Sequence, residues 1–365
     1  MCASPPLCRF LEKKTWRASM KERRQCSVAA QQAAPGTSRR ALLLLAHLVL
    51  FSFSPRPANS AQGEAEALLR WKDSLPPPRP ADALASWSLN GSAVAAAPVP
   101  CAWRGVSCDF LGRVVGVDVA GAGLASGTLA ALDIQSLASL GSLNLSFNAL
   151  TGRFFTPNVS APLLSVRSID LSNNNLSGPV PDTLPAWMPN LEHLNLSSNQ
   201  FMGEIPVTLG KLTKLRNLVL HSNHLSGGIP PVLGNVSGLR DLELSSNPLG
   251  GTIPATLGKL LSLERINVSL TRVESTIPTE LSLCTNLTVI GLAGNKLTGG
   301  LPPSLAKLAR VREFNVSKNM LTGEIPPGYF TSWTHLRVFQ ADGNRFTSMI
   351  PVEVVAARRL EFLHF

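Results

Sequence analysis

The sequence contains few residues of the kinds that usually carry chemistry. Among its 365 residues are six histidines, six cysteines and a single tyrosine, Tyr329. The histidines have no cysteine or carboxylate at metal-ligand spacing, so we expect no metal site. The sequence also lacks a nucleophile elbow, a phosphate-binding loop, a kinase signature and a pair of acids suited to catalysis. These absences argue against an enzyme and against a bound cofactor.

No apolar run reaches the roughly 20 residues that a membrane-spanning helix needs. The main one, Ala41–Phe53, follows a basic segment and precedes the small residues Ala58-Asn59-Ser60. This order is typical of a secretory signal. We therefore predict a signal peptide with a long basic leader over residues 1–60. A start at Met20, and a signal retained as a membrane anchor, remain open as alternatives.

The positive charge of the sequence is concentrated in this predicted signal. The formal net charge is +10, but residues 1–60 hold ten Lys/Arg against two Asp/Glu. The remaining chain holds 23 Lys/Arg against 21 Asp/Glu and is therefore nearly neutral. A basic balance that leaves with the signal does not indicate a nucleic-acid partner, and none is expected.

A repeat dominates the rest of the chain. From Leu191 to Pro326 the pattern Leu-x-x-Leu-x-Leu-x-x-Asn-x-Leu-x-Gly-x-Ile-Pro returns every 24 residues, and looser copies extend it in both directions. Its asparagine falls at Asn148, Asn174, Asn199, Asn223, Asn247, Asn295, Asn319 and Asn344. Ala122 and Thr271 occupy the same position in two irregular copies. A fixed period of this length predicts a leucine-rich repeat solenoid.

The residue types of one repeat, or rung, have physical reasons. Leu-x-Leu alternates, which predicts a short strand with leucines inward and the x residues outward. The asparagine amide can satisfy backbone groups of its own rung and of its neighbour. Glycine permits an unusual turn, and Ile-Pro enforces an extended segment. We predict an α/β right-handed solenoid over residues 113–365, with parallel strands on its concave face and about ten rungs, the last incomplete.

Residues 61–112 are predicted to cap the solenoid at its N-terminal end. Residues 64–72 have the apolar spacing of a helix, and a second short helical segment is expected around Trp87. Cys101 and Cys108 lie close together after a predicted signal peptide, which favours a disulfide over a metal site. Because the first rung of any solenoid has an open apolar face, a cap is needed there.

These motifs together resemble the extracellular part of plant leucine-rich repeat receptor-like kinases. The resemblance rests on Glu-Ala-Leu-Leu-Arg-Trp-Lys at residues 66–72, on Cys-x-Trp-x-Gly-Val-x-Cys at residues 101–108, and on the Leu-x-Gly-x-Ile-Pro rungs. It covers residues 62–365. It implies a domain whose concave face binds a peptide or protein ligand, while a co-receptor with leucine-rich repeats docks near the C-terminal rungs.

The resemblance also implies that this chain is one part of a larger receptor. The membrane anchor and the kinase would belong to segments that this chain does not contain. We expect passage through the secretory pathway and a place on the extracellular side of the plasma membrane, or in the apoplast for a free form. Two alternatives stay open: a secreted inhibitor of microbial wall-degrading enzymes, and a truncated decoy receptor.

Asn-x-Ser/Thr sequons are frequent, as in secreted glycoproteins. The candidate glycosylation sites are Asn90, Asn144, Asn158, Asn175, Asn195, Asn235, Asn267, Asn286 and Asn315. Because Asn-Leu-Ser also arises from the repeat consensus, a sequon alone does not establish modification. Four of these asparagines share one outward column between the strand leucines. A glycan there would cover part of the concave face.

Two adjacent rungs, at Val219 and Glu243, carry no sequon in that column, which predicts an open ligand-binding patch. The candidate residues are Arg216, Val219, His221, Arg240, Asp241, Glu243, Ser245 and Arg265. Arg216 and Arg240 belong to a column of five arginines with Arg167, Arg312 and Arg337. Such a column could bind carboxylate or sulfate groups. The simpler interpretation is a solvated edge in which Glu192 and Glu264 pair with the arginines.

Overall fold

The computed structural model describes residues 58–76, 83–89, 100–155, 161–347 and 349–365, with side chains from residue 61 onward. The predicted signal over residues 1–60 lies outside the described residues except for the backbone of its last three. The sequons at Asn90 and Asn158 also lie outside them.

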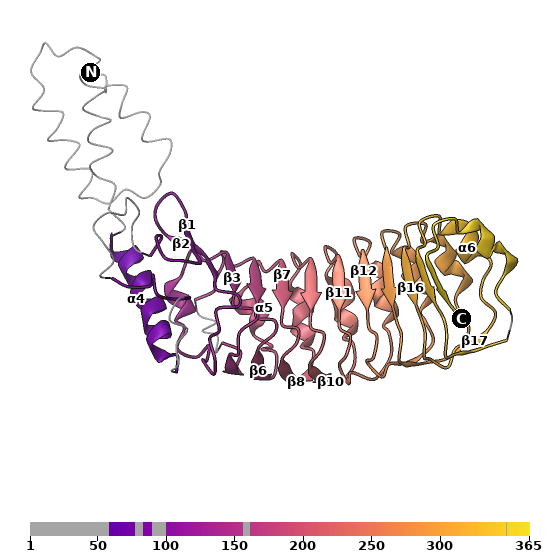
Figure 1. The fold of residues 1–365 in the computed structure, drawn as a ribbon, viewed down its shortest axis with the longest axis horizontal. Coiled ribbons are helices and arrows are strands. Elements are labelled where there is room, and N and C mark those ends of the chain that lie inside the picture. The colour runs from indigo at the N-terminus through magenta and orange to yellow at the C-terminus, as the bar shows by residue number, and fades with distance from the viewer. Residues whose placement is uncertain (1–57, 77–82, 90–99, 156–160, 348) are drawn as a thin grey trace, which may run out of the picture. The chain divides into compact units, whose positions relative to one another are not determined.

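One large sheet runs through the described part of the chain, and its strands follow one another in sequence order (Figure 1). They are β1 Val106–Cys108, β2 Val114–Asp118, β3 Ser142–Asn144, β5 Ser168–Asp170, β7 His193–Asn195, β9 Asn217–Val219, β11 Asp241–Glu243, β12 Arg265–Asn267, β14 Val289–Gly291, β16 Glu313–Asn315, β18 Val338–Gln340 and β20 Phe362–His364. From β2 to β20 all neighbours pair in parallel. The described chain therefore has eleven parallel strands, one for each rung, where the sequence predicts about ten rungs.

Short helices return the chain from one strand to the next. They are η1 Ile134–Ser136, α5 Leu184–Trp187, η2 Val207–Lys211, η3 Pro231–Asn235, η4 Ala255–Lys259, η5 Thr279–Leu283, η6 Pro303–Lys307, α6 Gly328–Ser332 and η7 Val352–Ala356. Several begin directly after the proline of Ile-Pro or its equivalent, such as Pro206 and Pro254. Proline fixes an extended backbone at this point, so the helix can start only beyond it.

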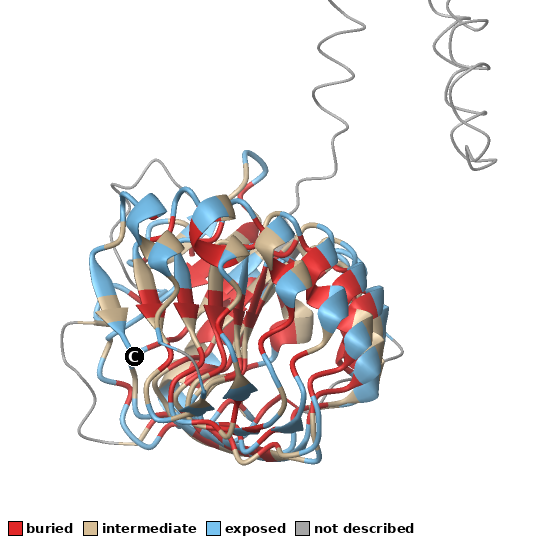
Figure 2. Cartoon of the chain, turned by 90° about the vertical axis from the view of Figure 1, so that its right-hand side faces the viewer, coloured by how far each residue is buried: buried red, intermediate tan, exposed pale blue. Residues whose placement is uncertain are grey.

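The turn after each strand adds a second, interrupted set of short strands. β4 Thr151–Arg153, β6 Asn175–Gly178, β8 Gln200–Glu204 and β10 His224–Ser226 form one four-stranded sheet. β13 Glu274–Ser275 pairs with β15 Lys296–Leu297, and β17 Thr322–Gly323 pairs with β19 Arg345–Phe346. The alternation of inward and outward side chains leaves the leucines in one continuous core, which Figure 2 shows as buried residues inside the coil.

The repeat asparagines join successive rungs inside this coil. At Asn247 the amide nitrogen donates to Leu220 O and Leu244 O, both at 3.0 Å, and the amide oxygen accepts from Leu225 N at 3.0 Å. The other asparagines of the series, from Asn148 to Asn344, make the same kind of bonds to their own rung and to the rung before. The coil thus buries backbone polar groups without leaving them unpaired.

The N-terminal cap is built on a helix and three tryptophans. Helix α4, Ala58–Ser74, buries Trp71 completely against the first rungs, and the Trp71 indole N–H donates to Thr128 O at 3.0 Å. The Trp87 ring lies 6.3 Å from that of Trp71 and stacks on Trp103 at 5.6 Å, measured between ring centroids. The predicted second helical segment is wrong. The backbone makes a single turn, with Trp87 N donating to Leu84 O at 3.1 Å, because Trp87 must enter between the other two indoles.

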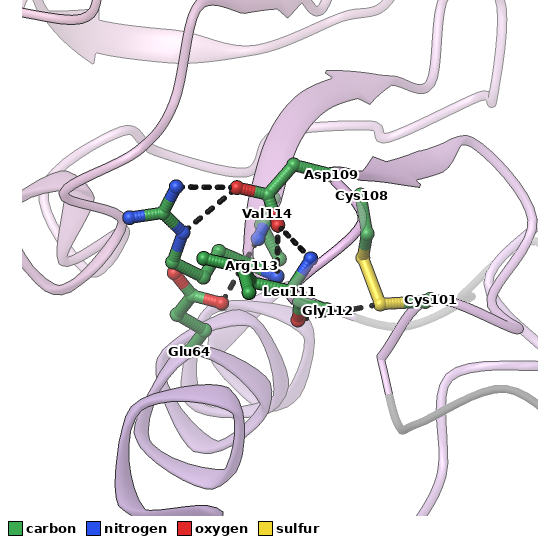
Figure 3. Close-up of a disulfide and its surroundings, with 8 residues drawn as sticks. All are labelled: Glu64, Cys101, Cys108, Asp109, Leu111, Gly112, Arg113 and Val114. Carbon is green, nitrogen blue, oxygen red and sulfur yellow. Dashed lines mark hydrogen bonds and ion pairs between the residues drawn. A yellow bond between two sulfur atoms is a disulfide. The ribbon is translucent and has the colours of Figure 1, made fainter. Parts of the chain in front are cut away.

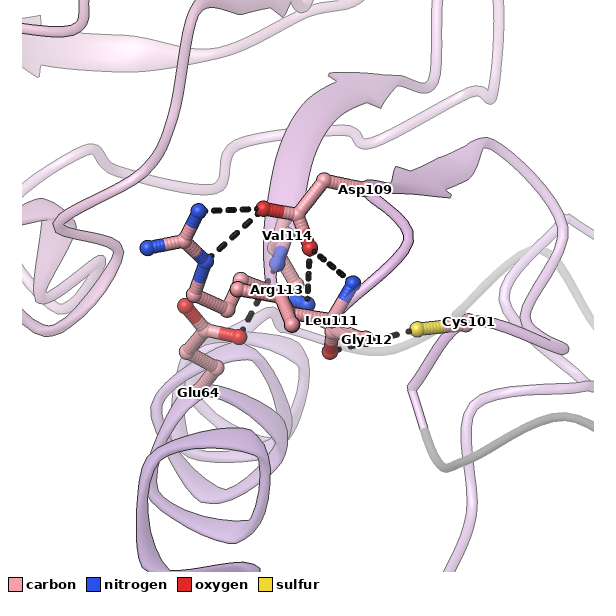
Figure 4. A network of polar contacts seen from close by, with 7 residues as sticks. All are labelled: Glu64, Cys101, Asp109, Leu111, Gly112, Arg113 and Val114. Atoms are coloured by element: carbon pink, nitrogen blue, oxygen red, sulfur yellow. Dashed lines mark hydrogen bonds and ion pairs between the residues drawn. The ribbon is translucent and has the colours of Figure 1, made fainter. Parts of the chain in front are cut away.

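A disulfide joins Cys101 and Cys108, as the sequence predicts, with a Cα–Cα distance of 5.6 Å (Figure 3). It ties the segment before β1 to β1 itself. Next to it, the Asp109 carboxylate closes the β1–β2 turn. It accepts from Leu111 N at 2.9 Å and from Arg113 N at 3.0 Å, and pairs with the Arg113 guanidinium at 2.6 Å (Figure 4). The hydrogen bond from the Arg113 side chain is the main cause of the lowered pKa of Asp109.

Glu64 connects the cap helix to the first parallel strand. It is buried, and its carboxylate accepts from Val114 N at 3.0 Å (Figure 4). Burial raises the pKa of Glu64 above its ordinary value of 4.5, despite the opposing effect of this hydrogen bond. A raised pKa in the folded state means that protonation favours folding. The contribution of Glu64 to the free energy of unfolding is therefore fully present below its unfolded-state pKa. It is lost as pH rises through its folded-state pKa.

We therefore expect Glu64→Gln to raise the melting temperature at pH 7, because glutamine can accept the same hydrogen bond without burying a charge. The difference in melting temperature between the Glu64→Gln variant and the parent should disappear near pH 4, where Glu64 of the parent is itself protonated. Thermal unfolding of both proteins between these pH values measures it. Glu66→Gln, on the same helix, serves as the control. A melting temperature that falls at pH 7 would show that the charge stabilises the cap.

Candidate ligand-binding surface

The outward side chains of the large sheet make one surface, here called the strand face. Parallel pairing holds each outward residue beside its equivalent in the next rung, as Asp241 lies beside Arg265. One outward column passes between the two inward leucines of each strand. It consists of Asp118, Asn144, Asp170, Asn195, Val219, Glu243, Asn267, Gly291, Asn315, Gln340 and His364. The strand face is therefore mainly polar along this column.

Three of the sequon asparagines in this column bond to a neighbouring rung. The side-chain amide of Asn195 donates to Asp170 Oδ2 at 3.0 Å, that of Asn267 to Glu243 Oε2 at 3.0 Å, and that of Asn315 to Gln340 Oε1 at 2.7 Å. These amide nitrogens are the atoms to which an N-glycan would be attached. By contrast, Asn175 and Asn235 are exposed. Glycosylation at each sequon stays a prediction. The three strand-face amides are engaged in hydrogen bonds, whereas Asn175 and Asn235 are exposed.

Asp241 does not belong to an open patch, contrary to the sequence-based expectation. Only 8% of the residue is exposed, and its Oδ2 accepts hydrogen bonds from the Arg265 guanidinium and, at 3.5 Å, from Asn217. The hydrogen bond to Asp241 raises the pKa of Arg265. Arg265 is consequently held in place by a buried carboxylate, while 58% of its side chain remains exposed. The guanidinium has five N–H donors, so several stay available for a ligand.

Glu243 is also occupied within the sheet. One carboxylate oxygen accepts from Ser245 N at 3.2 Å and the other from Asn267. Val219 and His221, on the rung of Arg216, and Ser245, on the rung of Glu243, are partly exposed. The surface of the central rungs is therefore apolar at Val219 and polar at the neighbouring Glu243, whose carboxylate is held by hydrogen bonds.

The arginine column is largely paired with glutamates, which favours the simpler of the two interpretations. Arg167 and Arg216 both lie near the carboxylate of Glu192, at 3.5 Å and 3.4 Å, and Arg240 lies 3.7 Å from Glu264. About half of the Arg216 and Arg240 side chains remains exposed. Exposed pairs of this kind are weak, on the order of 0–1 kcal/mol, so a ligand carboxylate can compete for these arginines.

No cluster of His, Cys, Asp and Glu suited to a metal ion occurs among the described residues. Within the same ranges no helix is both long and apolar enough to cross a bilayer. Cys284 is a buried free cysteine, and burial raises the pKa of its thiol to about 11. A thiol of this kind is a poor nucleophile at neutral pH.

Comparison with known families agrees with the repeat structure. The family model described as Leucine rich repeat N-terminal domain matches residues 61–109. Models described as Leucine rich repeat match residues 165–225, 238–260 and 286–308. The chain thus contains a leucine-rich repeat N-terminal domain followed by leucine-rich repeats.

Related proteins are plant receptors. The chain is 36% identical over 195 residues to the brassinosteroid LRR receptor kinase BRL3 of Oryza sativa subsp. japonica, covering 52% of this chain and 15% of that protein. Among solved structures it resembles the Arabidopsis receptor kinase HAESA in complex with the peptide hormone IDA and the co-receptor SERK1. That match has a TM-score of 0.70 and 30% identity, and covers 82% of this chain and 53% of HAESA.

The same coil also occurs outside receptors. A plant ice-binding protein matches with a TM-score of 0.68 and 25% identity, over 82% of this chain and 94% of that one. The chain spans only a small part of the BRL3 relative and about half of the HAESA chain.

Proposed function

We propose that this chain, which is similar to the ectodomains of plant leucine-rich repeat receptor kinases, is the ligand-recognition part of such a receptor. Its strand face binds a peptide or protein ligand, and a co-receptor with leucine-rich repeats joins the complex. The receptor acts at the extracellular side of the plasma membrane after passage through the secretory pathway. A serine/threonine kinase domain beyond this chain would carry the signal.

The observation that carries this proposal is the order of the outward side chains on the central rungs. Strands about 4.8 Å apart present equivalent positions at regular intervals, which suits a long, extended partner. Arg265 is fixed by buried Asp241 and still exposes most of its side chain, so it can bind a ligand carboxylate or carbonyl without being ordered first. HAESA, which shares the coil, was solved with a bound peptide hormone and a co-receptor.

The residues of this surface have different proposed roles. Arg265 is the main polar contact and Val219 the apolar contact. His221 and Ser245 flank Val219, and Arg216 and Arg240 exchange their glutamate partners for ligand carboxylates. Asp241 and Glu243 position Arg265 and Asn267 rather than touch the ligand.

A binding assay with a pool of synthetic secreted plant peptides tests this proposal. We expect at least one peptide to bind the chain, and Val219→Glu or Arg265→Glu to weaken it by about tenfold or more, because either change buries a mispaired charge against the ligand. Lys259→Glu, at an exposed position of helix η4, is the control and should leave binding within about twofold.

Two outcomes would contradict the proposal. One is a bound peptide whose affinity is unchanged by both strand-face substitutions. The other is a chain that binds no peptide but inhibits a microbial wall-degrading enzyme, which would favour the secreted inhibitor.

A further inference from the structure

The last four described rungs, from β14 to β20, form a hollow along the edge of the large sheet where its strands begin. The hollow has a main part of about 540 Å³ and an adjoining part of about 280 Å³. The residues that line the two parts, here called the basic hollow, are Thr288, Arg310, Arg312, His335, Arg337, Arg358, Arg359, Leu360 and Glu361. The hollow continues the column of Arg216 and Arg240 toward the C-terminal rungs but shares no residue with the proposed ligand surface.

Along this edge every arginine of the central rungs lies near a glutamate, whereas the last rungs contain arginines without one. The position directly before each strand segment is occupied in turn by Arg167, Glu192, Arg216, Arg240, Glu264, Thr288, Arg312, Arg337 and Glu361. In the central rungs each arginine of this column has a glutamate within 3.7 Å. Arg312, however, lies between the neutral Thr288 and Arg337, and Arg337 already pairs with Glu361.

Several cations of the basic hollow therefore lack a carboxylate. Among the described residues, no ion pair involves Arg312, Arg358 or Arg359, and all three are exposed. Arg310 bonds to the neutral Asn286 at 2.9 Å. Glu361 is the one acidic residue in the lining, and it forms an ion pair with Arg337. Packing of the coil does not require these cations, since the leucine core lies elsewhere, and their mutual repulsion opposes folding slightly.

Within the hollow, one arginine is already paired with a carboxylate. Arg337 donates from Nε and from Nη2 to the same oxygen of Glu361, at 2.8 Å and 2.6 Å. Charge-assisted bonds from a guanidinium to a carboxylate are among the stronger polar contacts in proteins. Leu360 adds an apolar part to the lining, which a peptide side chain or backbone can contact.

We propose that the basic hollow binds an acidic peptide segment of a protein partner. Asp or Glu carboxylates of the segment pair with Arg312 and Arg359, and Arg358 contributes positive potential at the rim. The basic hollow shares no residue with the proposed ligand surface, so the chain can bind a ligand on the central rungs and an acidic partner on the last rungs at the same time.

Fluorescence anisotropy with a labelled peptide of alternating Glu and Gly tests the site on the full chain. The double variant Arg312→Gln/Arg359→Gln should bind this peptide about tenfold or more weakly, because two charge-assisted contacts are lost. The matched control Lys211→Gln/Lys259→Gln removes the same net charge at two exposed positions outside the hollow and should change affinity by about twofold or less. Thermal unfolding of both variants shows whether they are folded.

Three outcomes would overturn the inference. An equal loss in both variants would show attraction by net charge alone. No binding by the parent chain would show that the hollow does not accept acidic peptides. Tighter binding of polygalacturonate than of the peptide, abolished by the same two substitutions, would assign the hollow to a polysaccharide instead.

Discussion

Replacing Asn247 by alanine is expected to lower the free energy of unfolding by about 3–5 kcal/mol, because the change removes several buried hydrogen bonds at once. The Asn247 amide serves Leu220 O and Leu244 O as donor and Leu225 N as acceptor, and only 2% of the residue is exposed. Alanine cannot pair these backbone groups, and water does not reach them. Urea unfolding followed by circular dichroism measures the loss.

A natural comparison lies one rung further along the chain. Thr271 occupies the asparagine position, and its hydroxyl donates to Val268 O at 2.6 Å. No described bond of its side chain reaches the rung before it. We therefore expect Asn247→Thr to cost less than Asn247→Ala. Asn190→Ala removes two exposed bonds, one donated to Leu164 O and one accepted from Lys214 Nζ, and should cost about 1 kcal/mol or less. Equal losses for Asn190→Ala and Asn247→Ala would disprove the special role of the buried series.

Trp87→Ala is expected to destabilise the N-terminal cap by about 3–5 kcal/mol, the usual range for removing a fully buried tryptophan. The Trp87 ring contacts Trp71 and Trp103, and its indole N–H donates to Arg104 O at 2.9 Å. Because each rung contacts only its neighbours, the effect should remain local. Hydrogen exchange should accelerate in α4, β1 and β2 while β14 and β16 keep their protection.

Trp87→Phe is the control for this prediction, since it keeps an aromatic ring but loses the indole bond and some volume. It should cost less than half as much as alanine. Equal acceleration of exchange in the cap and in the C-terminal rungs would instead show that the coil unfolds as one cooperative unit.

Much of the fold could be predicted from the order of residues alone. The period of 24 between asparagines such as Asn223 and Asn247 predicts the rung, and the Leu-x-Leu alternation predicts which side chains face inward. The pairing of Cys101 with Cys108 follows from their closeness in the chain and the secretory context. These features are local in the sequence or recur in every repeat, so they can be recognised without knowledge of contacts between rungs.

The candidate sites depended on contacts between rungs, which no single repeat contains. Asp241 looks like any outward acid in its own rung, and only the position of Arg265 in the next strand shows that it is buried and neutralised. Arg312 looks like Arg240, yet its neighbours leave it without a carboxylate among the described residues. The turn at Trp87 likewise depends on two other indoles far along the chain.

The sequence by itself thus determined the coil, its buried asparagines and its cap, because a leucine core and a backbone hydrogen-bond requirement act in every rung alike. Only the tertiary structure decided which outward charges are paired and which stay available. Side-chain charges find their partners across strands, at distances set by the stacking of rungs, and that stacking brings together residues that are a whole repeat apart in the chain.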